Sequence, residues 1–109
     1  MGYISITTDG SDTFLINKAA SDAKHTVLSA YSLKTNMSGQ AILAEAEALK
    51  FAVENDGIYD VGRLTGDIRV ISGKSNYVDF FIKLDGQRFI KVSVDRKELI
   101  NALVELAEK

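Results

Sequence analysis

The sequence has no cysteine and no proline, and histidine occurs only once. Without cysteine, disulfide frameworks, thiolate zinc sites and cysteine nucleophiles are excluded. No serine- and glycine-rich stretch interrupts the chain, so nothing in it is typical of a linker or a low-complexity tail. We therefore expect one domain over residues 1–109, close to the commonest domain length.

Long apolar runs are also missing. The longest extend over only a few residues, far short of the ~20 that cross a bilayer. The N-terminus becomes polar by Thr7 and does not resemble a signal peptide. We therefore expect a cytoplasmic protein that does not contact a membrane.

Neither sign of charge dominates the chain. The net charge is −2, with −3 on residues 1–57 and +1 on residues 58–109. Binding of duplex DNA depends on neutralising many phosphates, and this balance gives it no support. The apolar share of 46% and the charged share of 26% are typical of a folded globular domain.

In the C-terminal half, period-two alternation over 66–72, 77–84 and 88–94 predicts three strands. A helix over 96–108 follows, with Asp95 as its N-cap and Glu98 in the capping-box position.

The loop between the last two strands is predicted from side-chain parity. A two-residue loop would mix apolar and polar faces, whereas a three-residue loop over 84–86 places Phe80 opposite Ile90 and Val78 opposite Val92. We therefore expect a type I turn with a bulge and a left-handed Gly86.

The N-terminal half is predicted to hold strands over 3–7 and 13–16, and a third element over 25–33 that is a strand or a short helix, with the strand favoured. An alanine-rich helix over 39–55 follows, with Ser38 as N-cap and an exit at Asp56-Gly57. The fold class is therefore α+β, an antiparallel sheet of about five or six strands with two helices. The expected order is β-β-(β)-α-β-β-β-α.

Two short patterns are similar to reactive sites but lack essential parts. Residues 57–64, which we expect to form a loop between a helix and a strand, have the glycine spacing of a phosphate loop but no Lys-Ser/Thr pair, and they follow a helix instead of opening one. His25 lies near Ser21 and Asp22, yet no signal marks an oxyanion hole or a buried carboxylate. We assign no catalytic residue, no metal and no cofactor, and we expect a protein that is not an enzyme.

The second face of the C-terminal strands is the most informative feature. One face is apolar and suits packing against the last helix, whereas the other lacks the polar character of a solvent-facing sheet. The residues of this second face are Arg69, Ile71, Tyr77, Phe81, Lys83, Phe89 and Lys91. Three coverings are open: the helix over 39–55 or the N-terminal strands, a second copy of the chain, or unpaired bases.

From these features we expect a protein-interaction or regulatory module, either a small homo-oligomer or a stoichiometric inhibitor. Its contact surface would be the aromatic sheet face or the alanine-rich helix. The alternative is a single-stranded nucleic-acid-binding protein that uses Tyr77, Phe81 and Phe89 with Lys83 and Lys91.

The order of the predicted elements resembles in outline the roadblock/longin-type adaptor domains, which implies a dimerising regulator. A set of strands followed by a helix is also similar to the Whirly class, which implies single-strand binding. Both resemblances rest on element order and not on motif residues.

Overall fold

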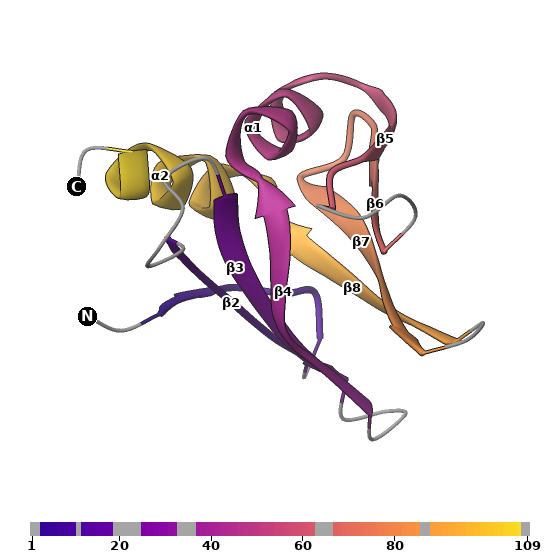
Figure 1. Cartoon of the computed structure of the whole chain (residues 1–109). Coiled ribbons are helices and arrows are strands. Elements are labelled where there is room, and N and C mark those ends of the chain that lie inside the picture. Colours follow the sequence, from indigo (N-terminus) through magenta and orange to yellow (C-terminus); the bar gives the residue numbers. More distant parts are fainter. Residues whose placement is uncertain are drawn as a thin grey trace.

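Four strands followed by a helix occur twice along the chain, as the computed structural model shows (Figure 1). It describes residues 3–10, 12–18, 25–32, 37–62, 67–85 and 88–107, with all their side chains except those of 37–43, 84, 85 and 88. The elements in this part of the chain are β1 (Ile4–Ile6), β2 (Thr13–Lys18), β3 (His25–Ser32), β4 (Met37–Glu45), α1 (Ala46–Glu54), β5 (Gly57–Asp60), β6 (Ile68–Ser72), β7 (Tyr77–Asp85), β8 (Arg88–Asp95) and α2 (Arg96–Ala107).

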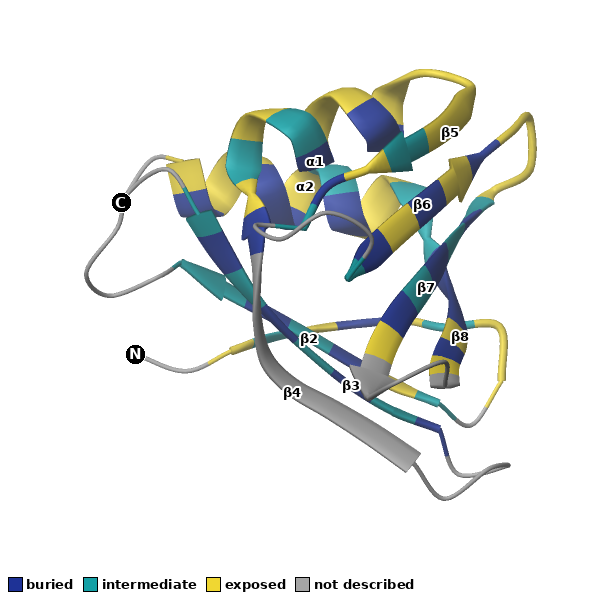
Figure 2. Ribbon diagram, turned by 45° about the vertical axis from the view of Figure 1, so that its right-hand side comes forward, coloured by how far each residue is buried: buried dark blue, intermediate teal, exposed yellow. Residues whose placement is uncertain are grey.

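The strands form two antiparallel sheets, ordered β1-β2-β3-β4 and β5-β6-β7-β8. Buried and exposed residues alternate along β6, and buried and half-buried residues alternate along β3. Because successive side chains of a strand point to opposite faces, each sheet turns one face to the interior and one outward. Figure 2 shows this alternation along β6 and β7.

The two sheets are joined to each other at both ends. Thr8, just after β1, bridges to Val94 of β8, and Ala44 of β4 bridges to Gly62 just after β5. At both junctions the residue that precedes a helix donates its backbone N–H to a carbonyl of the other sheet's segment. Asp95 donates to the Thr7 carbonyl and Glu45 to the Val61 carbonyl, each at 2.8 Å. Backbone hydrogen bonds therefore connect the eight described strands in a closed ring.

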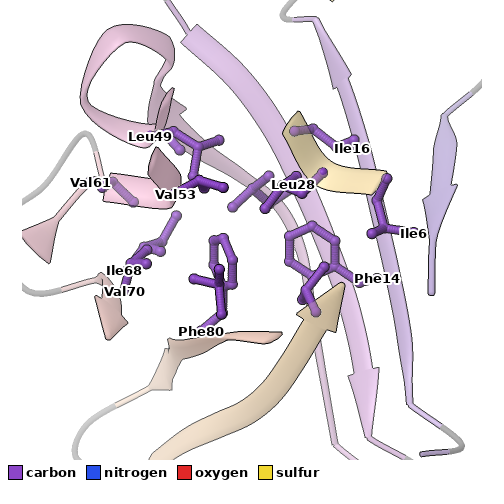
Figure 3. Packing of buried hydrophobic residues seen from close by; sticks show 14 of the residues in the cluster. Ile6, Phe14, Ile16, Leu28, Leu49, Val53, Val61, Ile68, Val70 and Phe80 are labelled. Atoms are coloured by element: carbon purple, nitrogen blue, oxygen red, sulfur yellow. The ribbon is translucent and has the colours of Figure 1, made fainter. Parts of the chain in front are cut away.

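A single core fills the space between the sheets, and both helices cover it at one end (Figures 1 and 2). The rings of Phe14 from β2 and Phe80 from β7 meet across it, with centroids 4.9 Å apart. Leu49 and Val53 of α1 join this cluster beside Ile68 (Figure 3). At about 25 cal/mol per Å² of buried apolar surface, this shared core is the main stabilising term of the fold.

The α+β class, the antiparallel pairing and the two helices are confirmed. The strand favoured over 25–33 is present as β3, and the helix expected over 96–108 is α2. The described residues form eight strands in two sheets, where about five or six were expected. The fourth strand before each helix was the missing part.

The prediction of a helix over 39–55 is wrong in its first half. Met37–Glu45 forms β4, paired with β3 through Thr26 opposite Ala44 and Tyr31 opposite Ser38, so Ser38 is a strand residue and not an N-cap. Helix α1 begins only at Ala46. Pairing with β3 and with the chain near Gly62 outweighs the helix propensity of the alanines, which is a weak local preference.

The end of this helix agrees with the sequence. Helix α1 stops at Glu54, and Gly57 has a φ of +140°, a conformation that other residues rarely adopt. The loop expected over 57–64 is strand β5 in its first four residues, because these pair with β6.

The predicted parity of the last hairpin is confirmed, but its register is shifted. Phe80 lies opposite Val92 and not Ile90, and Val78 lies opposite Val94 and not Val92. The shift is two residues, which keeps every side chain on its expected face. A register irregularity lies between Lys83 and Asp85, in the region of the expected bulge, whereas Gly86 falls outside the described residues.

Candidate functional site

The outward face of the second sheet carries all the residues singled out from the sequence. Val78, Phe80 and Val92, which alternate with these residues along the same strands, are fully buried in the core. Because successive side chains point to opposite faces, the predicted site residues lie on the outward face. Each of its side chains is exposed or half-buried. We call this surface the aromatic face; its residues are Arg69, Ile71, Tyr77, Phe81, Lys83, Phe89 and Lys91.

Pairing between strands arranges rings and cations in rows across the aromatic face. One row runs Asp60, Arg69, Phe81, Lys91 over the four strands from β5 to β8. In the next row Lys83 lies opposite Phe89. Neighbouring strands are about 4.8 Å apart, so the cations of Arg69 and Lys91 extend from strands about 10 Å apart with the ring of Phe81 between them.

A shallow hollow of about 240 Å³ lies at the centre of the aromatic face, lined by Arg69, Ile71, Phe81 and Phe89. Phe89 is 44% exposed and Ile71 is 37% exposed, so both border the hollow without being covered. Three of the four lining residues are therefore apolar, and the fourth brings a guanidinium group to the rim.

The charges at the hollow are unevenly paired. The Arg69 Nε donates to Asp60 Oδ1 at 3.2 Å, and both side chains are about half exposed. In the row on the other side of Phe81, where Asp79 lies opposite Ser93, the Ser93 hydroxyl donates to Asp79 Oδ1 at 2.6 Å. Lys83 and Lys91 have no ion-pair partner within the part of the chain that the structure describes. Their ammonium groups are available to an anion that approaches the face.

Tyr77 is separated from the other two rings. It lies two rows from Phe81 along β7, about 13 Å away at the rise of a strand. It lines a different hollow, of about 620 Å³, with Asp95, Arg96 and Lys97 at the start of α2. The structure thus brings Phe81 and Phe89 together with the three cations and leaves Tyr77 at the margin.

Covering of the aromatic face from within the monomer is not found among the described residues. Helix α1 and the N-terminal strands pack on the opposite, inner face, through Leu49, Val53 and Phe14. The two remaining coverings, a second copy of the chain and unpaired bases, both come from outside the monomer.

Sequence reasoning missed two residues of this surface. Ile58 is 68% exposed and lies opposite Ile71, and Asp60 holds Arg69. Both were assigned to a loop. In the structure Tyr59 is half-buried and Val61 buried while Ile58 and Asp60 are exposed, which is the period of a strand, but the apolar Ile58 hides this alternation in the sequence.

The other candidate sites remain poorly supported. Within the described residues no three His, Cys, Asp or Glu side chains come together as metal ligands. His25 lines a hollow with Lys18 and Lys50, and Ser21 and Asp22 fall outside the described part of the chain. No described helix is both long and apolar enough to span a bilayer.

No known protein family, no curated protein and no solved structure matches the chain. The expected order of strands followed by a helix, twice, fits roughly, but four strands precede each helix, so the outline shared with the roadblock/longin type is not matched in strand number.

Proposed function

We propose that this protein binds single-stranded nucleic acid through the aromatic face. The observation that carries the proposal is the register of rings and cations: Phe81 lies between Arg69 and Lys91, and Phe89 lies opposite Lys83. Each ring therefore has a cation on a neighbouring strand. The role is one of binding and involves no catalytic step.

Stacking and charge neutralisation both follow from this arrangement. An unpaired base stacked on an aromatic side chain gains about 1–3 kcal/mol, whichever base it is. A cation beside each ring meets the phosphate that accompanies the base. Bases of a duplex are stacked on each other and cannot lie flat on the rings, so single strands are the expected ligand.

The acidic net charge is compatible with this role because the cations are concentrated locally. Lys83 and Lys91, which have no ion-pair partner among the described residues, lie with Arg69 on one face of a chain whose net charge is −2, beside the carboxylates of Asp60 and Asp79. Neutralising three phosphates of a single strand gives a slope of about −2 for the logarithm of the association constant against that of the salt concentration.

The test is fluorescence anisotropy with a labelled thymine oligonucleotide of about 12 nucleotides, within the span of single-strand sites. We expect Lys91→Glu and Phe89→Ala to weaken binding about tenfold each, since one base stacked or one phosphate contacted is worth roughly that much. Lys50→Glu on α1 makes the same charge change elsewhere, and Tyr31→Ala removes a ring from β3; both leave binding unchanged. No binding at low salt, or equal effects of Lys91→Glu and Lys50→Glu, contradicts the proposal.

A protein contact is the second candidate, favoured by the apolar margin of the same face. Ile58 and Ile71 lie opposite each other at its β5 edge, 68% and 37% exposed, and Phe89 is 44% exposed. A regulatory module acting as a small homo-oligomer or a stoichiometric inhibitor would bury such a patch. Sedimentation velocity distinguishes the two: a concentration-dependent dimer that Phe89→Asp dissociates supports this candidate, and a monomer at high concentration removes its homo-oligomeric form.

A further inference from the structure

The hollow at the centre of the aromatic face has one polar side chain whose direction is set by a neighbour. Arg69 lies between Asp60 on β5 and Phe81 on β7, and its Nε donates to Asp60 Oδ1 at 3.2 Å. Within the described residues its two terminal nitrogens make no hydrogen bond. Arg69 also lines the hollow, so its guanidinium group brings to the rim two donor nitrogens that have no partner among the described residues.

From this geometry we infer that the hollow selects guanine among unpaired bases, an inference that rests on the proposed single-strand binding. Guanine carries two adjacent acceptors, O6 and N7, which match the arginine fork in the commonest specific arginine contact to a base. Adenine has the N6 amino donor beside the N7 acceptor, so one donor of the arginine fork would face another donor. Thymine has no pair of adjacent acceptors.

The size of the hollow favours the same base. Its volume is about 240 Å³, and Phe81 and Phe89 lie diagonally across the β7–β8 pair, so the apolar floor is longer than one ring. A two-ring purine covers this floor while its O6/N7 edge points toward Arg69. Cytosine, whose O2 and N3 are also adjacent acceptors, has one ring and covers less of it.

Asp60 acts as a positioning residue in this scheme. Its carboxylate fixes Arg69 through Nε and leaves the terminal nitrogens for the base, but its charge also repels phosphate. Asp60→Asn therefore has two opposite effects. The affinity for a thymine tract rises, and the preference for guanine falls. A purely structural role of Asp60 would shift the affinity for the thymine tract and the affinity for the guanine-containing strand in the same direction.

The experiment uses the full chain and thymine oligonucleotides in which one central base is varied. We expect a single guanine to strengthen binding about five- to hundredfold, the range for one bidentate contact. Replacing it by 7-deazaguanine, which keeps both rings and O6 but lacks N7, abolishes most of the gain. Arg69→Lys keeps the charge and removes the fork, so binding persists and the preference is lost, whereas Lys50→Arg on α1, outside the aromatic face, leaves the preference unchanged. The same series in uridine-tract RNA shows whether DNA or RNA is the better source of the base.

The outcomes separate the inference from the function beneath it. Equal affinity for all bases, or a preference for adenine or cytosine, overturns guanine selection while single-strand binding stands. Absence of binding to any oligonucleotide overturns both. The 7-deazaguanine arm needs no variant, so its result holds even if a substitution at Arg69 affects folding.

Discussion

At the scale of single residues, the contacts of Arg96 could not be read from the sequence. Its position as the first residue of α2 was expected, but its side chain reaches back to three other segments. It donates to the Val53 carbonyl at the end of α1, to the Ser72 hydroxyl at 2.8 Å, and to the carbonyls of Gly73 and Ser75 in the β6–β7 turn. One guanidinium therefore ties the end of α1 to the start of α2.

We predict that Arg96→Ala lowers the free energy of unfolding by about 2–3 kcal/mol, since hydrogen bonds to a charged group contribute about 1.5–3 kcal/mol and several carbonyls lose their donor. Arg96→Lys falls between, because an ammonium cannot reproduce the planar fork. Urea denaturation measures both. Arg69→Ala is the matched control: its one ion pair is about half exposed, and its loss costs within about 0.5 kcal/mol. Equal losses for the two variants contradict the assignment.

Gly62 shows a second effect at this scale, caused by close approach. A Cβ at Gly62 would lie 1.5 Å from Asp67 Oδ1, whereas a Cβ at Gly73 would have no atom within 4 Å. We predict that Gly62→Ala costs about 1–3 kcal/mol, as overpacking does. Gly73→Ala stays near neutral or gains up to about 1 kcal/mol from a less flexible unfolded chain. Thermal denaturation followed by circular dichroism compares the pair, and similar melting temperatures contradict the prediction.

At the scale of elements, the two helices begin in different ways. Asp95 Oδ1 accepts the Glu98 N–H at 3.0 Å, so the expected N-cap of α2 is confirmed. Glu98 does not close the capping box; its Oε1 accepts the N–H of Thr7 at 3.2 Å and ties α2 to β1. Helix α1 starts after Glu45, whose side chain makes no capping bond. Its stability comes from the burial of Leu49, Ala52 and Val53.

This difference predicts unequal effects of the same substitution. Asp95→Ala should lower the free energy of unfolding by about 1 kcal/mol, the usual cost of a lost N-cap. Glu45→Ala removes no capping bond and should change stability by less than about 0.5 kcal/mol. Chemical denaturation of the two variants provides the comparison. A larger loss of unfolding free energy for Glu45→Ala than for Asp95→Ala contradicts the prediction, because the N-cap bond of Asp95 would then contribute less than a side chain that makes no capping bond.

At the scale of the whole molecule, two similar halves share one core. Each half is four strands and a helix, yet the core has no boundary between them, because Phe14 of the first half meets Phe80 of the second. The bridges at Thr8–Val94 and Ala44–Gly62 also connect the halves through the backbone. Such an arrangement is expected to unfold as one cooperative unit.

We predict that Phe80→Ala lowers the free energy of unfolding by about 3–5 kcal/mol, the cost of truncating a buried phenylalanine. Both halves should lose structure in the same transition. Tyr31 reports on the first sheet and Tyr59 on the second half, so hydrogen exchange or tyrosine NMR signals follow the two separately. Different midpoints for the two probes would falsify the single cooperative unit.

The sequence alone determined the local features. Period-two alternation over β6, β7 and β8 records which side of each strand faces the core, so the aromatic face and its cations were predicted without knowing what the strands pack against. The capping residue Asp95 and the apolar stripe likewise specified α2. Even a wrong register left the faces intact, because the shift was even.

The tertiary structure decided whatever depends on partners distant in sequence. Residues 37–45 are a strand because β3 and the chain near Gly62 offer backbone partners, which the local preference of alanine does not reveal. The same long-range pairing brought Ile58 and Asp60 onto the aromatic face and Arg96 onto the end of α1. Local pattern fixes the orientation of a side chain, but the choice of neighbour is made by the free energy of the whole assembled core.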